Sequence, residues 1–175
     1  MYPSFITPGE HDYLVDFVSP LLDAAEYYSS HWDQVISEYR EMELHIDKWD
    51  KECRNIFSRQ RSLFPEGTNW KEKIHVLDLQ EGGRIDHHID SVDASGSIIS
   101  GISLLSDSVF QLKDETTGSE VDVYLPKRSL YIMKNSVRYN YGHAIQPGQV
   151  DFNGKKIKKT RRISIISRDK LTNFE

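Results

Sequence analysis

The chain has 175 residues, of which 38% are apolar and 28% are charged, a composition that suits a globular protein with one substantial core. Its formal net charge of -5 argues against a general nucleic-acid-binding surface, because such a surface needs an excess of Lys and Arg to displace counterions from phosphates. Cys53 is the only cysteine, which excludes an intrachain disulfide and a zinc site built from several cysteines.

The N-terminal residues offer no targeting signal. Residues 1–12 contain acids and no arginine, unlike a mitochondrial presequence, and they lack the charged start of a secretory signal. No apolar stretch reaches the roughly 20 residues that a membrane-spanning helix needs, so we expect no membrane span. From these features alone the expected location is cytoplasmic.

Two helices are predicted in the first third of the chain. Thr7, Pro8 and Glu10 form a capping-box pattern with proline in the first turn, and apolar residues then recur at helical spacing up to Leu22. A second helix is expected at 47–63. Its apolar residues have the spacing of a core-facing side: Trp49, Cys53, Ile56 and Phe57.

From His75 onward, short segments rich in Val, Ile, Leu and Tyr alternate with turn residues such as Gly82-Gly83 and Pro147-Gly148. This pattern predicts a mainly β protein with N-terminal helices, whose core is a double-stranded β-helix, the jelly roll of cupin-like proteins. We expect a single domain over residues 1–175, with a helical layer at about 1–73 and the jelly-roll core at about 74–170. The eight expected strands are 75–79, 84–90, 97–105, 109–113, 121–125, 129–133, 137–145 and 161–168.

The motif His-x-Asp occurs three times, starting at His31, His45 and His88. On a strand, residues i and i+2 point to the same face and can share a metal, whereas on a helix they point roughly 200° apart. The first two copies lie beside or within helical patterning. Only the third ends a predicted strand, so His88 and Asp90 are the candidate metal ligands.

A third candidate ligand is His143, which lies 55 positions after His88 on another predicted strand. Two histidines and one carboxylate on one face of an iron leave the opposite positions free for oxygen and a chelating co-substrate. His87 is the alternative to His88, but it faces the other side of the strand. His75 fits a structural role better than a ligand role.

The segment from Arg162 to Arg168 adds a co-substrate clamp. Arg162, Ser164, Ile166 and Arg168 share one strand face, and at a rise of about 3.3 Å per residue the two arginine backbones are roughly 20 Å apart. Their side chains, about 7 Å each, shorten this gap to roughly 6 Å, about the length of a five-carbon diacid such as 2-oxoglutarate. Tyr131 can add a hydroxyl donor. The alternative is that both arginines form ion pairs at a barrel rim.

Together these motifs resemble the AlkB-type family of Fe(II)- and 2-oxoglutarate-dependent dioxygenases, and within it a mitochondrial branch. The resemblance covers nearly the whole chain. It implies iron ligation by His88, Asp90 and His143, with O2 as second co-substrate and a location in the mitochondrial matrix. It also implies 2-oxoglutarate contacts from a further set of residues: Leu77, Tyr131, Arg162, Ile163, Ser164 and Arg168. The motifs that carry it are His31-Trp32-Asp33, Tyr39-Arg40-Glu41, His75-Val76-Leu77-Asp78-Leu79, His88-Ile89-Asp90-Ser91, residues 101–106, residues 129–132, Arg138-Tyr139, His143 and Arg161-Arg162-Ile163-Ser164.

The substrate is less defined. Where nucleic-acid demethylases of this family carry an Asn-x-Tyr strand and a lid that grips a flipped base, this chain has Leu77-Asp78-Leu79 and only a short segment before it. The resemblance therefore implies a protein or metabolite substrate, with a role in mitochondrial fatty acid metabolism and programmed necrosis. An alternative is demethylation of mitochondrial RNA, supported by the basic run at 155–161. A non-catalytic jelly-roll binding module is the third hypothesis.

Overall fold

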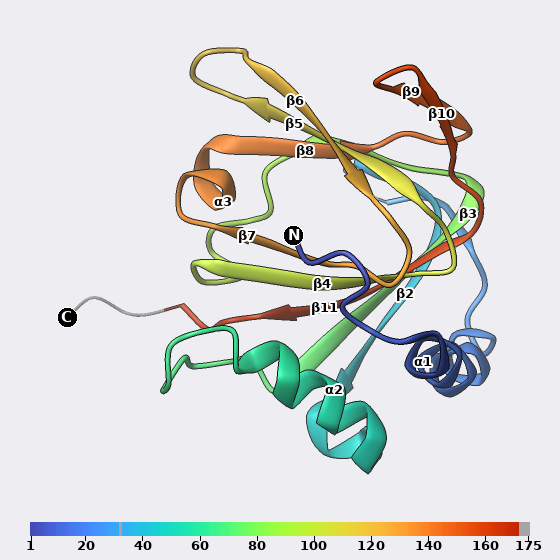
Figure 1. The fold of residues 1–175 in the computed structure, drawn as a ribbon, viewed down its shortest axis with the longest axis vertical. Coiled ribbons are helices and arrows are strands. Elements are labelled where there is room, and N and C mark those ends of the chain that lie inside the picture. Colours follow the sequence, from blue (N-terminus) through green and yellow to red (C-terminus); the bar gives the residue numbers. More distant parts are fainter. Residues whose placement is uncertain (32, 172–175) are drawn as a thin grey trace.

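The chain folds as an antiparallel sheet rolled into two facing layers, with two helices packed against the outside of one layer (Figure 1). The coordinates are a computed structural model that describes residues 1–31 and 33–171, so Trp32 of the first His-x-Asp motif lies outside the described residues. Neighbouring segments in this sheet are often distant in sequence, as expected for the predicted jelly roll.

Both predicted helices are present. α1 (Pro8–Leu22) begins with the expected capping box, in which the Thr7 hydroxyl accepts a hydrogen bond from the Glu10 amide and the Glu10 carboxylate accepts one from the Thr7 amide. α2 (Lys51–Arg61) begins later than predicted, because the Asp50 side chain accepts a hydrogen bond from the Cys53 amide and caps the helix there. A short 3-10 turn, η1 (Ile46–Lys48), precedes it. Within the part of the chain that the structure describes, no helix has the length and apolar character needed to cross a bilayer.

Nine strands of the described residues share one sheet, and β3 belongs to both of its layers. Its first half pairs with β2 and β11 in the layer that the helices cover, and its end pairs with β8 in the opposite layer. The helix-covered layer contains β1 (Tyr28–Ser30), β2 (Ile36–His45), β3 (Lys73–His88), β11 (Arg162–Arg168), β4 (Ile98–Leu104) and β7 (Leu130–Lys134). The other layer continues through β8 (Tyr141–Ile145), β5 (Ser108–Asp114) and β6 (Glu120–Leu125).

Two parts of the strand prediction were wrong around β3. The segment assigned to the helical layer contains the strands β1 and β2. Along β2, Arg40, Met42 and Leu44 share the inner face, and the residues between them point outward. The glycines expected to make a turn instead lie inside β3. A Cβ on Gly83 would lie 2.6 Å from the backbone oxygen of Glu38, so glycine serves here for close approach of two strands.

Two further differences lie near the C-terminus. Residues predicted to start a strand at 137 form α3 (Ser136–Asn140), and the strand β8 begins only at Tyr141. The residues after Pro147, where no strand was predicted, form a hairpin of β9 (Gln149–Phe152) and β10 (Lys155–Lys158). Asn153 and Gly154 at its tip both have positive φ, 51° and 77°, and Asn-Gly is a strong hairpin signal that the strand prediction missed.

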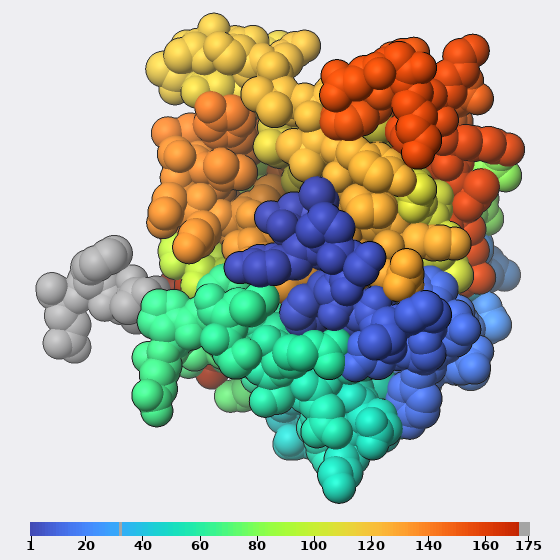
Figure 2. Space-filling view, viewed as in Figure 1, coloured from blue at the N-terminus to red at the C-terminus, as the bar shows by residue number. Residues whose placement is uncertain are grey.

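The alternation of residues along each strand creates two separate apolar cores. Val76, Ile163 and Ile165 point toward α1 and α2 and pack with their buried side chains. Leu77, Leu79 and Ile166, one position away, point between the two layers. In the space-filling view the blue N-terminal segment and α1, with the blue-green α2, cover the lower part of the face shown (Figure 2). The helices therefore shield one face of the sheet, and the space between the layers remains for the site.

Candidate metal and co-substrate site

His88, Asp90 and His143 come together where β3 meets β8. His88 is the last residue of β3 and pairs with His143 of β8, while Asp90 follows two residues after the strand. The Asp90 Oδ1 atom lies 3.1 Å from His88 Nε2 and 3.6 Å from His143 Nε2. One potential ligand atom from each residue lies within 4.8 Å of the others, which is close enough for the three side chains to bind one metal ion.

The surroundings favour the metal-binding protonation states of His143 and Asp90. Burial, together with the neighbouring His88, lowers the pKa of His143 to about 3, so its imidazole is neutral with a lone pair available. Burial alone would raise the pKa of Asp90, but the hydrogen bond from His88 and the charge of Arg168 outweigh it and hold that pKa well below its usual range. His88 Nδ1 donates to the Asp86 carbonyl at 2.9 Å, which directs Nε2 toward the cluster.

The other histidines point elsewhere. The His87 side chain lies on the opposite face of β3, where its Nε2 is 2.8 Å from a Glu115 carboxylate oxygen. His31 contacts Asp33, and His45 contacts Asp47, so each of these His-x-Asp copies pairs within itself. Among the described residues, a histidine from another strand joins His88-Ile89-Asp90 and neither of the other two copies.

A narrow cavity of about 60 Å³ runs between the two sheet layers and is lined by both clamp arginines and by the three candidate ligands. Arg162 is 2% exposed, and its Nε donates to Ser103 Oγ at 3.1 Å. Its Nη2 atom and the Ser164 hydroxyl are buried and have no hydrogen-bond partner among the described residues. Burial also lowers the pKa of Arg162, because no carboxylate of the described chain neutralises the guanidinium. A carboxylate group entering the cavity would satisfy both orphaned groups.

Tyr131 and Leu77 also line this cavity. The Tyr131 ring packs on Phe110 with ring centroids 5.4 Å apart, and burial raises the pKa of its hydroxyl, which stays protonated as a donor. Ile163, the remaining residue of the expected contact set, does not line the cavity with its side chain. Ile163 points to the helix-side core, since adjacent residues of a strand face opposite sides, and only its backbone can lie near a co-substrate.

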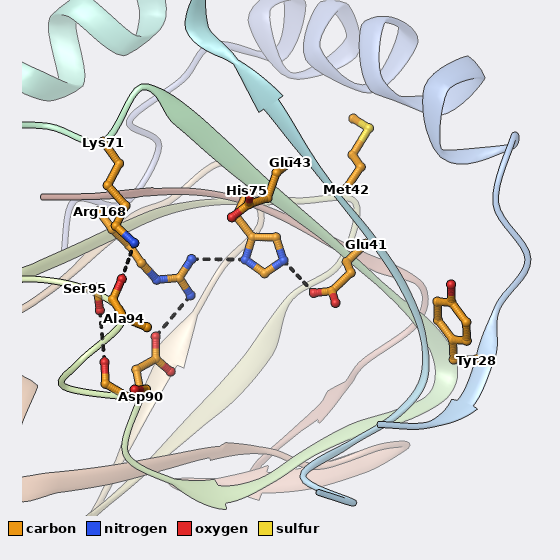
Figure 3. A pocket seen from close by; sticks show the side chains of 11 residues that line it. Tyr28, Glu41, Met42, Glu43, Lys71, His75, Asp90, Ala94, Ser95 and Arg168 are labelled. Carbon is orange, nitrogen blue, oxygen red and sulfur yellow. Dashed lines mark hydrogen bonds and ion pairs between the residues drawn. The ribbon is translucent and has the colours of Figure 1, made fainter. Parts of the chain in front are cut away.

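Arg168 lies at the mouth of the cavity, with its side chain 21% exposed. Its Nη2 donates to Asp90 Oδ2 at 3.1 Å, and its Nη1 lies 3.1 Å from His75 Nδ1. A wider groove of about 580 Å³ begins here, sharing His75, Asp90 and Arg168 with the cavity (Figure 3). The alternative, in which both arginines form ion pairs at the barrel rim, does not describe Arg162, which is buried and has no ion-pair partner among the described residues. Arg168 does form an ion pair, with Asp90.

Arg138 is a supporting residue whose role could not be assigned from its sequence position. It is 2% exposed and extends from α3 to the loop that carries Asp90. Its guanidinium donates to the carbonyls of Asp90 at 2.9 Å, Ser91 at 3.1 Å and Gly96 at 3.2 Å. Because Asp90 lies outside the paired part of β3, these hydrogen bonds connect its backbone to α3. In the sequence, Arg138-Tyr139 stood out only as a family motif, which did not indicate the backbone carbonyls that Arg138 contacts.

Asp78 organises the opposite face of β3. Its carboxylate is fully buried and accepts hydrogen bonds from Arg40, Arg161 and Tyr27 at 2.8 to 3.0 Å. Burial raises the pKa of Asp78, but the hydrogen bonds from Arg161 and Arg40 outweigh it, so the pKa is lowered. The Leu77-Asp78-Leu79 segment, which stands where the Asn-x-Tyr pattern would be, thus holds a cluster of ion-paired side chains on the helix side of the sheet.

Comparison with known proteins gives the family. A model of the 2OG-Fe(II) oxygenase superfamily matches residues 24–168. The chain belongs to this superfamily. The alpha-ketoglutarate-dependent dioxygenase alkB homolog 7, mitochondrial, from Bos taurus is 37% identical over 169 residues, covering 95% of this chain and 76% of that protein. The same protein from Mus musculus is 35% identical over 171 residues, covering 96% and 76%.

Within the 2OG-Fe(II) oxygenases, the chain is therefore an AlkB-type dioxygenase related to alkB homolog 7. It is an enzyme that uses Fe(II), 2-oxoglutarate and O2. The crystal structure of a Pseudomonas putida prolyl-4-hydroxylase superposes with a TM-score of 0.68 at 12% identity, covering 97% of this chain and 90% of that one. This similarity supports the jelly-roll fold alone.

Proposed function

We propose that His88, Asp90 and His143 bind the Fe(II) of this dioxygenase and that Arg162 and Arg168 hold 2-oxoglutarate between them. The observation that carries the proposal is the pair of orphaned buried groups, Arg162 Nη2 and Ser164 Oγ, in the same cavity as the three candidate ligands. A buried guanidinium without a counter-charge is costly unless a ligand supplies one. Tyr131, Leu77 and the backbone of Ile163 complete the co-substrate contacts.

Each protein group has a separate task in this proposal. Arg162 and Ser164 bind the distal carboxylate deep in the cavity, and Arg168 holds both Asp90 and the metal-proximal end of the co-substrate. The apolar walls formed by Leu77 and Phe110 exclude water from the reacting atoms. When bound together, Fe(II), 2-oxoglutarate and O2 supply an oxidant that takes hydrogen from a substrate carbon, with succinate and CO2 as the other products.

Anaerobic addition of Fe(II) and 2-oxoglutarate tests the metal assignment. The visible charge-transfer band of the chelate should appear in wild type and in His87→Ala, because His87 faces away from the cluster. It should be lost in Asp90→Ala. A band that survives Asp90→Ala, or that depends on His87, would show that the metal binds elsewhere.

The substrate is proposed to be a protein side chain or a metabolite, and the location is proposed to be the mitochondrion. Support comes from the open groove of about 580 Å³ beside Asp90, and from the relatives named as mitochondrial. A role in mitochondrial fatty acid metabolism and programmed necrosis is part of the same proposal. Mass spectrometry of mitochondrial extracts incubated with wild type or with Asp90→Ala should show proteins or metabolites that gain one oxygen atom only with wild type. Identical extracts would refute the proposed mitochondrial substrate.

The RNA alternative rests on the β9–β10 hairpin. Lys155, Lys156 and Lys158 are exposed, but none lines the groove at Asp90, and Lys158 pairs with Glu81 at 2.9 Å. Lys159 is buried against backbone carbonyls and adds nothing to the surface charge. Salt-sensitive RNA binding that is lost on changing the three exposed lysines to Glu would favour RNA, and unchanged binding would exclude this hairpin.

We also infer that residues 1–175 act as one dioxygenase domain. The superfamily model spans residues 24–168, and the α1 residues Leu14 and Val18, which precede it, are buried in the same core as Ile163 of β11. Removing α1 should therefore expose the core and abolish cooperative unfolding, which a denaturant titration would show. A truncated chain that still unfolds cooperatively would refute this inference. The non-catalytic binding module is disfavoured by membership of the oxygenase superfamily.

A further inference from the structure

Three hydrogen bonds connect the open groove to a candidate metal ligand through residues from three strands. Glu41 of β2 lies 2.8 Å from His75 Nε2 on β3. The other ring nitrogen of His75 lies 3.1 Å from Arg168 Nη1 on β11. Arg168 Nη2 in turn donates to Asp90 Oδ2 at 3.1 Å. Figure 3 shows the four side chains in this order, and we refer to Glu41, His75, Arg168 and Asp90 as the relay.

The chemistry of the groups fixes the direction of every hydrogen bond in the relay. A guanidinium has only donors, so His75 Nδ1 must accept from Arg168 through its lone pair. The imidazole proton is then on Nε2, from which it is donated to the Glu41 carboxylate. The hydrogen bond from His75 lowers the pKa of Glu41, which keeps that carboxylate an acceptor. A histidine protonated on Nδ1 could not take part.

The relay holds the Arg168 guanidinium at two points. One terminal nitrogen contacts His75, and the other contacts Asp90 Oδ2. The second Asp90 oxygen, Oδ1, is thereby left facing His88 and His143. A free arginine side chain has about 2 kcal/mol of rotamer entropy to lose, and Arg168 sits beside a wide groove into which it could turn. A second anchor for this side chain therefore matters for the position of both the carboxylate and the guanidinium.

We propose that Glu41 and His75 are positioning residues, which orient Arg168 and, through it, Asp90 for co-substrate and metal binding. This inference rests on the proposed function of Arg168 and Asp90. The competing explanation is that Glu41 and His75 form only a cross-strand ion pair between β2 and β3. A purely structural pair would change the stability of the protein but not the affinity for 2-oxoglutarate.

Glu43 provides a matched control. It lies two residues from Glu41 on the same strand and lines the same groove, but its carboxylate pairs with the exposed Lys73 at 3.4 Å and does not belong to the relay. Titration of 2-oxoglutarate into the anaerobic Fe(II) protein, followed by the charge-transfer band, gives the dissociation constant of each variant. Loss of an outer contact of this kind typically weakens binding about 10-fold or more, which we expect for Glu41→Ala and His75→Leu but not for Glu43→Ala.

His75→Asn separates the two hydrogen bonds of the imidazole. The amide oxygen of asparagine takes the place of Nδ1 and accepts from Arg168, but the residue cannot reach Glu41. We expect its affinity for 2-oxoglutarate to lie between those of wild type and His75→Leu. This variant, with Glu41→Ala, keeps the test valid if His75→Leu fails to fold.

The tautomer of His75 gives a readout without iron or 2-oxoglutarate. Nitrogen-15 NMR of the metal-free protein should show His75 protonated on Nε2 and unprotonated on Nδ1, and Arg168→Gln should perturb the Nδ1 signal. An Nδ1-protonated ring, or affinities in Glu41→Ala and His75→Leu equal to that in Glu43→Ala, would overturn the inference while leaving the proposed function intact. If wild type itself binds no 2-oxoglutarate, the proposed function fails instead.

Discussion

Two adjacent arginines, Arg161 and Arg162, should respond in opposite ways to the same substitution. Arg162 is 2% exposed, its Nε donates to Ser103 Oγ, and its buried Nη2 has no partner among the described residues. Replacing buried charged groups by apolar side chains of similar volume often leaves the free energy of unfolding unchanged or raises it by about 1–4 kcal/mol. Arg162→Met should therefore unfold at the same denaturant concentration as wild type or a higher one, when no co-substrate is present.

The affinity of Arg162→Met for 2-oxoglutarate should be reduced, in contrast to its unchanged or increased stability. A hydrogen bond to a charged group contributes about 1.5–3 kcal/mol, so losing two between Arg162 and a carboxylate costs about 3 kcal/mol or more. That energy corresponds to 2-oxoglutarate binding weaker by roughly 100-fold or more, measured by the charge-transfer titration. The extra stabilisation that 2-oxoglutarate gives to the Fe(II) protein should be correspondingly smaller in Arg162→Met.

Arg161→Met is the control. Arg161 donates two hydrogen bonds to the buried Asp78, at 3.0 and 2.8 Å, but its own side chain is 39% exposed, so solvent screens the pair. We expect a loss of about 1–2 kcal/mol in the free energy of unfolding with unchanged 2-oxoglutarate affinity. The reasoning is refuted if Arg162→Met is the less stable variant in the absence of co-substrate, or if it binds 2-oxoglutarate as wild type does.

Three further predictions concern the framework of the site. Asp78→Asn should lower the free energy of unfolding at neutral pH by about 3 kcal/mol, because Arg40 and Arg161 lose their buried partner. Folding lowers the pKa of Asp78, so its contribution to the free energy of unfolding is present above the ordinary carboxyl pKa and is lost as the pH falls. Urea titrations should therefore show the stability difference between wild type and Asp78→Asn shrinking toward acidic pH. A stability difference that does not change with pH would contradict this assignment. Arg138→Met should weaken Fe(II) binding about 10-fold or more by releasing the loop that carries Asp90, as judged by metal titration, and equal metal affinity would rule out that role. Gly83→Ala should destabilise the protein by about 1–3 kcal/mol in denaturant titrations, since its Cβ would meet the Glu38 carbonyl, whereas a neutral effect would mean that the strands can separate.

Local rules were enough to predict some of these features from the sequence. The capping box at Thr7 depends on four consecutive residues, and the common face of Arg162 and Arg168 depends only on the alternation of a strand. Both were confirmed because no distant contact competes with them. The fold class was also confirmed, because short strands separated by turn residues are a pattern typical of jelly rolls.

Features that depend on contacts between distant segments were missed. Gly82 and Gly83 have the composition of a turn, and only the approach of β2 explains why they lie inside β3. α3 forms where the strand pattern continues, and its Arg138 is fixed by carbonyls more than 40 residues earlier in the chain. The relay from Glu41 to Arg168 depends on the pairing register of three strands, and the sequence does not encode that register in any local motif.

The alternation of β11 also limits how this protein can change in evolution. Arg162, Ser164, Ile166 and Arg168 face the cavity, while Ile163 and Ile165 between them fill the core under the helices. Inserting or deleting one residue here would turn every following side chain to the other face, placing a guanidinium in an apolar core and an isoleucine at the co-substrate. Related sequences should therefore vary freely in length at the β9–β10 hairpin but keep a constant spacing from Arg162 to Arg168.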